Sequence, residues 1–528
     1  MVKLTFYGGV REIGGNKVLL EEDRGKLFLD YGYPYKKYRD FYEEYLKPRP
    51  GAGLLDLLVM GLLPKLEGIY RTDLETEDLW QRFRRAEHYR RLVDINGILL
   101  THAHLDHSGH IAFLREDIPV YATATTAFIA KAIQDSGKAS FDQQVCYFTP
   151  RVEECAGGLK QGAYVASSAG DCQRRFCVAD SSKLSQEARK FWEKATGRKK
   201  LAGQPLDDIS RCSFTLHCFP VDHSIPGACA WGIETSSGWV IYSGDLRLHG
   251  RQGELTESMI KEAARLHPRA LILEGTNVDR PTNVSEQEVY ENALKAIRDA
   301  RGLVIADFSP RDVNRLLTFL QVARDTKRKL AILPKDAYLL KTMRLLEPSI
   351  PDLAADGSLV IYQETTAAKS PAAWLRSIYD DYSTKIVLAK DVGANQGDFI
   401  LSFSFWDLNE LPSMQPRSGS LYVFSSSEPH DEEQQMDFWR LHHWLKHFEL
   451  RAFGLPVARN RGWEIPEEEK GLHASGHACG PDLLRVAREI RPEILVPVHS
   501  ERPEFYVDNL SKSGMDIILP TEGEMVAI

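Results

Sequence analysis

Residues 101–107, Thr-His-Ala-His-Leu-Asp-His, bring three imidazoles and one carboxylate together within a few positions. Both groups are ligands for zinc and related borderline metals. His102 and His104 alternate and would point the same way from an extended segment, whereas Asp106 and His107 would turn toward a second point. This spacing suits two metals side by side. The alternative is a solvated histidine-rich loop, which is disfavoured because the chain has only 16 histidines in 528 residues.

The cluster follows a short apolar run, Gly-Ile-Leu-Leu at 97–100, which predicts a buried strand. Further strand-like runs are found at 4–7, 17–21, 26–30, 240–242 and 270–273. The last two of these runs end in acidic motifs. Strands that alternate with helical stretches predict α/β layers.

A second α/β rhythm begins near residue 284. A helix is predicted over 285–301, with Ser285 as its N-cap and Glu288 at the capping-box position. The pattern then predicts strands at 303–306 and 330–333, separated by a helix over 311–326. It continues to about residue 452, and residues 472–528 return to strand-and-histidine motifs. We therefore predict that the second unit is inserted into the first.

The composition is that of an ordinary folded protein, with 43% apolar and 27% charged residues. The net charge of −8 argues against a long non-specific nucleic-acid arm, but bound divalent metals would add local positive charge. The eight cysteines form no Cys-x-x-Cys pair and are predicted to be free and mostly buried. Neither a signal peptide nor a bilayer-spanning segment is recognisable, so we expect a cytoplasmic protein with no membrane contact.

The His-x-His-x-Asp-His motif resembles that of the metallo-β-lactamase superfamily, and further motifs occur in the order of that family. Asp30 resembles its structural aspartate, His223 its third-motif zinc ligand and Asp245 the aspartate that bridges both metals. The resemblance implies an α/β fold, a metallo-β-lactamase αββα sandwich with an inserted α/β β-CASP domain.

Three later motifs narrow the resemblance to the β-CASP nucleases, especially the ribonuclease J family. Leu-Ile-Leu-Glu at 271–274 resembles motif A with Glu274 as its acid, and 473–477 resembles motif B. Motif C is matched by 497–501, whose His499 favours RNA over DNA by analogy with the RNA-acting branch. A β-lactamase or thioesterase would lack the inserted unit and these motifs.

The resemblance implies a cofactor of two Zn²⁺ per chain, with Mn²⁺ or Mg²⁺ as possible replacements. One zinc would be held by His102, His104 and His223. The other would be held by Asp106, His107 and His499, with Asp245 bridging. A hydroxide between the metals would be the nucleophile, since zinc lowers the pKa of bound water to about 7.

Asp106, His477 and Glu274 are the predicted catalytic side chains. A carboxylate beside an imidazole favours the protonated ring, so His477 could stabilise the phosphate or protonate the leaving 3′ oxygen. The alternative for His477 is a structural histidine in the layer around the ligands. His473 could contact substrate or be structural. The remaining predicted substrate contacts are Ser475, Ser427 and Arg315.

The predicted domains are residues 1–282 and 456–528 for the metallo-β-lactamase part and 283–455 for the β-CASP part. The first part contains an insertion at about 140–210 that has no counterpart in the ribonuclease J pattern, and we call this segment the surplus. That surplus carries basic clusters at 174–175 and 198–200. They are predicted to lie on a solvated face, and the alternative is a lid or RNA-contact element.

Two departures from the ribonuclease J pattern bear on function. Ser427 stands where the family has the glycine of a Gly-Glu-Pro segment, which puts its mode of binding the RNA backbone or 5′ end in doubt. Only 29 residues follow His499, so the family's C-terminal domain is not expected and the oligomeric state cannot be carried over.

The sequence therefore predicts a zinc-dependent ribonuclease acting on single-stranded RNA. One alternative is a DNA nuclease or other phosphodiesterase on the same scaffold, and another is a non-catalytic RNA-binding assembly subunit. The choice between endonuclease and 5′–3′ exonuclease stays open.

Overall fold

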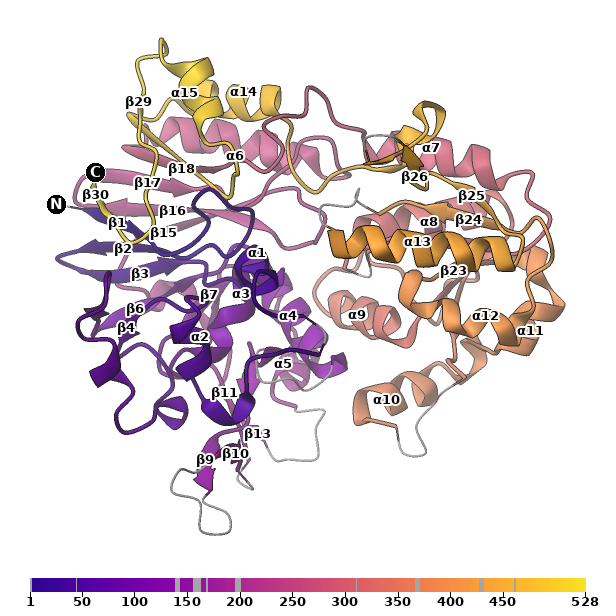
Figure 1. Cartoon of the computed structure of the whole chain (residues 1–528), viewed down its shortest axis with the longest axis horizontal. Helices are drawn as coiled ribbons and strands as arrows, with labels where there is room; N and C mark the ends of the chain where they lie inside the picture. Colours follow the sequence, from indigo (N-terminus) through magenta and orange to yellow (C-terminus); the bar gives the residue numbers. More distant parts are fainter. Residues whose placement is uncertain are drawn as a thin grey trace.

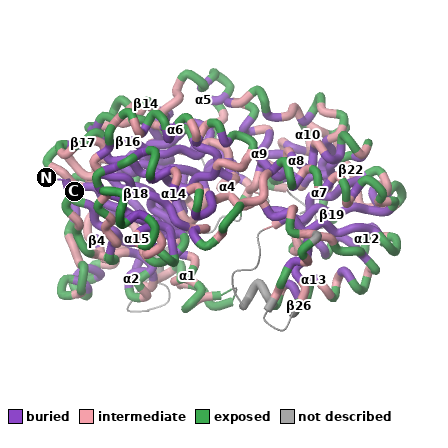
Figure 2. The backbone as a smooth tube through the Cα atoms, turned by 90° about the horizontal axis from the view of Figure 1, so that it is seen from above, coloured by how far each residue is buried: buried purple, intermediate pink, exposed green. Residues whose placement is uncertain are grey.

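The computed structural model shows two lobes side by side, the larger of which holds both termini (Figure 1). In each lobe the most buried backbone lies in the interior (Figure 2). No helix among the described residues is long and apolar enough to cross a membrane. The structure describes the whole chain apart from residues 1, 44, 138–142, 155–162, 168–169, 195–200, 310, 366–370, 427–431 and 460–461.

Two sheets form the centre of the larger lobe, with strand orders β14-β12-β7-β6-β3-β2-β1-β30 and β15-β16-β17-β18-β28-β29. The eight-stranded sheet contains β1 (Lys3–Phe6), β2 (Val18–Glu22), β3 (Gly25–Leu29), β6 (Ile95–Leu99), β7 (Val120–Ala122), β12 (Phe176–Val178), β14 (Asp207–Asp208) and β30 (Met525–Ala527). The six-stranded sheet contains β15 (Leu216–Pro220), β16 (Cys229–Thr235), β17 (Gly238–Tyr242), β18 (Ala270–Glu274), β28 (Ile494–Val498) and β29 (Asp516–Ile517).

The two sheets pack face to face through side chains that alternate inward along each strand. Leu29 and Leu99 of the first sheet share one buried cluster with Tyr242, Ile272 and Val496 of the second. The outer face of the six-stranded sheet is covered by α6 (Gly253–Arg265), α14 (Gly480–Ile490) and α15 (Glu504–Leu510). The other outer face is covered by helices that include α2 (Leu55–Val59) and α4 (Ala124–Ser136). The predicted αββα sandwich is confirmed.

The smaller lobe is a parallel sheet of order β22-β21-β20-β23-β19-β24-β25 covered by helices. Its strands are β19 (Val304–Asp307), β20 (Lys329–Ile332), β21 (Leu359–Tyr362), β22 (Ile386–Val387), β23 (Phe399–Ser402), β24 (Leu421–Phe424) and β25 (Arg451–Phe453). Its helices are α7 (Glu286–Ile297), α8 (Val313–Asp325), α9 (Pro334–Arg344), α10 (Ala373–Asp381), α11 (Ala389–Ala394), α12 (Leu411–Met414) and α13 (Glu432–His447).

The helix predicted over 285–301 is α7, and the capping box of Ser285 and Glu288 is confirmed. In the sequence, the smaller lobe falls between β18 and β28, which pair in parallel as neighbouring strands of the larger lobe. The chain therefore leaves the six-stranded sheet after Glu274 and returns to it at Ile494.

The surplus near 140–210 packs beside the smaller lobe. Lys183 of this segment pairs with Glu347 of the smaller lobe, and the preceding helix α4 contacts the same lobe, where the Tyr338 hydroxyl of α9 donates to Asp135 (3.0 Å). Arg174 of the predicted basic clusters is buried, and its guanidinium donates to the backbone carbonyls of residues 112, 114 and 115. The prediction of a solvated or RNA-contacting Arg174 is therefore wrong, since its carbonyl contacts lie within the lobe. Residues 198–200 lie outside the described part of the chain.

The described cysteines are free, as predicted, and four of them are buried. Cys155 lies outside the described residues. The predicted basic residue Arg175 forms an ion pair with Asp207 (2.9 Å) and remains partly exposed. The surplus thus contributes packing and ion pairs to the larger lobe.

Asp307, at the end of β19, provides a test of the smaller lobe. Burial raises the pKa of this carboxyl to about 7, even though the Tyr422 hydroxyl donates to it. The folded state therefore binds more protons than the unfolded state between about pH 4 and 7, so this group lowers stability as pH rises through that window. We expect Asp307→Asn to stabilise the protein by about 2 kcal/mol at pH 8 and much less at pH 5. Denaturant titrations at both pH values measure this, and equal shifts would contradict it.

Candidate metal centre

Asp30 holds the histidine cluster in place from directly after β3. Its carboxylate accepts hydrogen bonds from the backbone N–H and the hydroxyl of Thr101 (both 2.8 Å) and from the Tyr242 hydroxyl (2.7 Å). It also accepts from Nδ1 of His107 (2.7 Å). The Asp30 backbone adopts φ +54°, which is uncommon outside glycine. Asp30 thus has the supporting contacts that its predicted role requires.

A close approach of two backbones fixes the turn at Asp106. Tyr31 N–H donates to the carbonyl of His107 (2.9 Å), and Tyr33 N–H donates to that of Leu105 (2.8 Å). A Cβ on Gly32, between the two, would lie 1.6 Å from the carbonyl oxygen of Asp106. Only glycine therefore fits there, and the segment after β3 is rigidly tied to the histidine cluster.

Three histidines form the first donor group. Nδ1 of His104 lies 3.1 Å from Nε2 of His102 and 3.2 Å from Nε2 of His223. Each ring comes from a loop that follows a strand of the larger lobe, after β6 for the first two and after β15 for His223. The structure thus brings together the three residues predicted for one metal.

The second donor group consists of Asp106, His107, Asp245 and His499. Nε2 of His499 lies 3.3 Å from the Asp106 carboxylate, and Nε2 of His107 lies 3.1 Å from Oδ2 of Asp245. The same Oδ2 lies 3.6 Å from Nε2 of His102. The Asp245 carboxylate therefore stands between the two groups, at the position that a bridging ligand needs.

The ring nitrogens that face away from the centre have oxygen partners. Nδ1 of His223 donates to the carbonyl of Gly476 (2.6 Å), and Nδ1 of His499 hydrogen-bonds the Thr276 hydroxyl (2.8 Å). Such partners fix the tautomer and leave the opposite nitrogen to bind metal. Nδ1 of His107 is held in the same way by Asp30.

Burial and neighbouring charges set the protonation of the donors. Burial and neighbouring histidines lower the pKa of His102 and His223 well below its ordinary value, and the pKa of His104 falls to about 4. Burial opposes the charged form of Asp245, but the imidazoles of His107 and His499 outweigh it and hold its pKa well below the usual range. The first donor group is thus held neutral and Asp245 ionised, which are the forms that bind metal, whereas Asp245 and Asp30 outweigh burial and raise the pKa of His107 well above its ordinary value.

Unsatisfied buried atoms also fit a metal centre. Nε2 of His107 and Oδ1 of Asp245 are buried, and neither has a hydrogen-bond partner among the described residues. Such groups are expensive to bury unless a ligand satisfies them. A histidine-rich donor set with shared carboxylate suits zinc better than a hard cation. The residues present therefore fit a metal of the zinc type.

His477 lies beside the centre and is paired with Glu274. Its Nδ1 donates to Oε2 of Glu274 (2.9 Å) and lies 3.9 Å from the Asp245 carboxylate. Burial lowers the pKa of an imidazole, but these carboxylates outweigh it and raise that of His477 to about 9. Glu274 itself is fixed by the N–H of Leu246 (2.8 Å). The pair thus presents a protonated ring next to the donor groups.

The other predicted substrate contacts have mixed outcomes. His473 is buried and its Nδ1 donates to the carbonyl of Ser426 (2.6 Å), which favours the structural alternative. The Ser475 hydroxyl accepts from Asn277 (2.7 Å) and from the N–H of His477 (3.1 Å), so it supports the turn that carries His477. Ser427 lies outside the described residues.

The prediction that Arg315 contacts substrate is wrong. Its side chain is buried in the first turn of α8 and pairs with Glu286 (3.2 Å). It also donates to the carbonyls of Ser425, Leu472 (3.2 Å) and Ala474 (3.1 Å). Every direction of the guanidinium is thus used inside the protein, where it holds the segment leading to His477.

Several residues of the site carry no signal of their own in the sequence. Arg247 donates to the carbonyl of Ser475 (3.1 Å) and pairs with Glu286 (3.4 Å) and Asp222 (3.3 Å). In the sequence, its position two residues after Asp245 is the feature that could have indicated a role in the site. Thr276 and Asn277 follow Glu274 and act on His499 and Ser475, which only the fold brings near.

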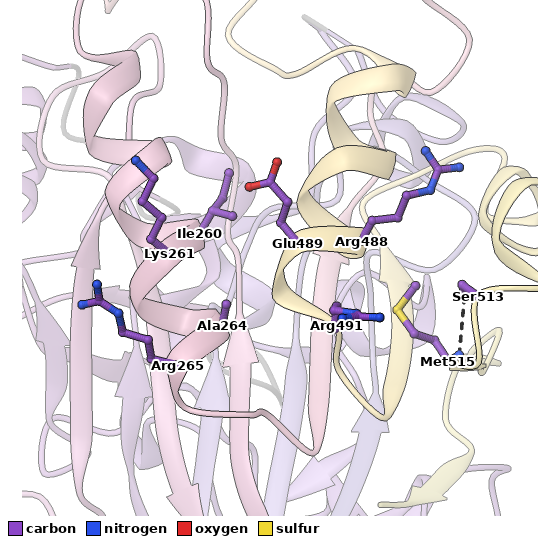
Figure 3. Close-up of a pocket in the computed structure, with 9 residues that line it drawn as sticks. All are labelled: Ile260, Lys261, Ala264, Arg265, Arg488, Glu489, Arg491, Ser513 and Met515. Carbon is purple, nitrogen blue, oxygen red and sulfur yellow. Dashed lines mark hydrogen bonds between the residues drawn. The ribbon is translucent and has the colours of Figure 1, made fainter.

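A separate cavity of about 740 Å³ lies between α6 and α14, on the outer face of the six-stranded sheet (Figure 3). Lys261, Arg265 and Arg488 contribute to its lining, but their charged ends point in different directions (Figure 3). They do not converge on one ligand. The chemistry-bearing side chains of the described chain gather instead at the two donor groups.

Comparison with known proteins agrees with this geometry. Residues 468–520, which include His477 and His499, match the family model "Zn-dependent metallo-hydrolase RNA specificity domain". Ribonuclease J of Mycolicibacterium smegmatis is 24% identical over 506 residues, covering 94% of this chain and 68% of that protein. Ribonuclease J of Sinorhizobium meliloti is 25% identical over 502 residues, with the same coverage.

This chain resembles the ribonuclease J proteins, β-CASP members of the metallo-β-lactamase superfamily. A solved structure of a protein of unknown function from Enterococcus faecalis V583 has the same fold, with a TM-score of 0.66, 20% identity and complete coverage of both chains. The predicted resemblance and fold class are confirmed. The use of metal is supported by the family model and by the two donor groups of this chain.

Removal of metal provides one test of the centre. Without a cation, the carboxylates of Asp106 and the buried Asp245 lie close together, so we expect a chelator to lower Tm by roughly 5–10 °C and zinc to restore it. Asp245→Asn should lower Tm and abolish the response to zinc. Differential scanning fluorimetry measures both effects. A Tm that changes with neither chelator nor zinc would refute the metal centre.

A second test concerns Arg315. Replacing it by Ala leaves Glu286 and the carbonyls of Leu472 and Ala474 buried without their partner, so we expect a loss of about 3–5 kcal/mol in stability. Urea denaturation measures the loss. The matched control is Arg324→Ala at the exposed end of α8, which should change stability by less than about 1 kcal/mol. Equal losses in the two variants would contradict the structural role.

Proposed function

We propose that this chain is a metal-dependent ribonuclease that hydrolyses phosphodiester bonds of single-stranded RNA. The observation that carries the proposal is the position of His477, a ring held by Glu274 beside the two donor groups, with Asp245 between them. The additional proton-bearing ring suits a reaction in which an alkoxide must leave.

The centre is proposed to hold two zinc ions, one at His102, His104 and His223 and the other at Asp106, His107 and His499. Asp245 would contact both, which its position between the groups supports. Such a metal pair supplies a hydroxide nucleophile and neutralises charge on the phosphate. Mn²⁺ or Mg²⁺ could occupy the same positions, although the imidazole donors favour zinc.

The residues of the chain supply the proton transfer. Nδ1 of His477 is occupied by Glu274, so its Nε2 carries the proton that can be delivered to the leaving 3′ oxygen. The Glu274 carboxyl group is the hydrogen-bond partner that favours the protonated form of the ring. The carbonyl of Ser475, held by Arg247 (3.1 Å) and His249 (2.9 Å), fixes the turn from which His477 projects.

RNA is proposed as substrate on two grounds. The matching family model is described as an RNA specificity domain and covers both His477 and His499. The relatives that span 94% of the chain are named ribonuclease J. The proposed division into 1–282, 283–455 and 456–528 is supported by the parallel pairing of β18 with β28 on either side of the smaller sheet.

The test compares matched single-stranded RNA and DNA oligomers labelled at either end, with metal content measured on the same samples. We expect about two zinc ions per chain and cleavage of RNA, with products that show internal cuts or stepwise trimming. His477→Ala should lower kcat by about 10²-fold or more while retaining zinc, because it removes the proton donor and leaves the ligands.

Exposed His443 on α13 offers the control, since His443→Ala removes an imidazole away from the centre. Its activity should equal that of the unmodified chain. Robust cleavage of DNA with inert RNA would overturn the choice of substrate. Full activity of His477→Ala would overturn the role of that ring.

A further inference from the structure

The loop between β19 and α8 meets the metal centre from the smaller lobe. The Asp312 side chain caps α8 by accepting from the N–H of Arg315 (2.9 Å). One residue into the helix, the amide of Asn314 donates to the carbonyl of His223 (3.0 Å), a residue of the first donor group. The start of α8 is therefore fixed against the centre, and the residue just before the cap lies at its edge.

That residue is Arg311, and it differs from Arg315 in its surroundings. Arg315 is buried and paired with Glu286, whereas Arg311 is partly exposed. Arg311 forms no ion pair with any carboxylate in the described part of the chain. Its side chain lies close enough to His104 for its charge to act on that ring. The guanidinium thus lies near the donor groups and keeps its charge for another partner.

Tyr35 of α1 (Tyr35–Arg39) contacts Arg311 from the larger lobe. The charges of Arg311 and Asp106 both act on its hydroxyl, so the Arg311 side chain lies close to Tyr35. Burial raises the pKa of Tyr35, so the hydroxyl stays neutral. The Tyr33 N–H that donates to Leu105 ties this segment to the histidine cluster. Tyr35 therefore holds its hydroxyl at a set position beside Asp106.

The positive charge of Arg311 indicates which ligand Arg311 and Tyr35 would bind. Each RNA phosphate carries one negative charge, and the chain itself has a net charge of −8. Metal ions neutralise the phosphate that is cleaved, but the neighbouring phosphate of the same strand remains uncompensated. An arginine without a carboxylate partner, at the edge of the donor groups, supplies the missing cation.

We propose that Arg311 and Tyr35 bind the RNA phosphate adjacent to the scissile phosphate, with Arg311 as the cationic contact and Tyr35 as the group that orients its guanidinium. This inference rests on the proposed ribonuclease function. The contact joins the lobes, because Arg311 comes from the loop before α8 and Tyr35 from α1. Only substrates that carry a second phosphate can make this contact, and smaller phosphodiesters cannot.

The test compares RNA with bis(p-nitrophenyl) phosphate, which has one phosphate only. For Arg311→Ala we expect kcat/KM on RNA to fall by about 10–100-fold, mostly through KM, because a charge-assisted contact of equal strength before and during the reaction is lost. The fall on the small diester should be at least about tenfold smaller. The slope of log KM against log salt should drop by about 0.7, the value for one phosphate contact.

Conservative variants separate charge from geometry. Arg311→Lys keeps the charge but loses the planar fork, so it should recover the salt slope and only part of the affinity. Tyr35→Phe should raise KM on RNA by about threefold to tenfold and leave the salt slope unchanged, because it removes no charge. Arg301→Ala, an exposed arginine at the opposite end of β19, is the matched control and should match the unmodified chain.

The outcomes distinguish this inference from the proposed function. If the unmodified chain hydrolyses the small diester but not RNA, the ribonuclease proposal fails and this inference fails with it. If RNA is cleaved but Arg311→Ala leaves KM and the salt slope unchanged, only this inference is overturned. Equal losses on both substrates, together with lower zinc content, would assign Arg311 to the structure of the centre and also overturn it.

Discussion

The carboxylate of Asp245 is the group around which the site is organised. It is buried on the loop after β17, within 4 Å of ring nitrogens from His102, His107, His223, His477 and His499. A single buried charge among so many imidazoles is tolerable only if cations share it. Its loop belongs to the six-stranded sheet, and the histidine cluster follows β6 of the eight-stranded sheet. The face-to-face packing of the two sheets therefore determines whether the donors meet at all.

A second charged network connects this centre to the smaller lobe. Glu286, the first residue of α7, pairs with Arg247 of the larger lobe and with Arg315 of α8. The same two arginines donate to the carbonyls of Ser475, Leu472 and Ala474, so the turn carrying His477 is held from both sides. Removal of any one charge would leave the others buried without balance. The network makes the position of His477 depend on how the two lobes are docked.

Sequence patterns predicted the parts of the site that are local. His102 to His107 sit on one turn, and their spacing alone predicted metal binding. The Ser285 capping box was equally legible, because its two partners are three residues apart. The helix predicted over 311–326 begins two residues later, since Asp312 acts as its cap. Contacts between distant segments, such as Asn314 with His223 or Thr276 with His499, left no pattern that a single sequence could reveal.

Arg311 and Arg315 illustrate a physical reason why a single sequence does not reveal such contacts. The two arginines are four residues apart in one motif, but only Arg315 lies within α8, on its buried face, where Glu286 and three carbonyls surround it. Arg311 precedes the cap and is directed by the loop toward Tyr35. Which arginine faces inward depends on the packing of α8 against α7 and on its docking against His223. A sequence shows two equivalent cations, and only the assembled interface between the lobes makes one of them structural and leaves the other for a ligand.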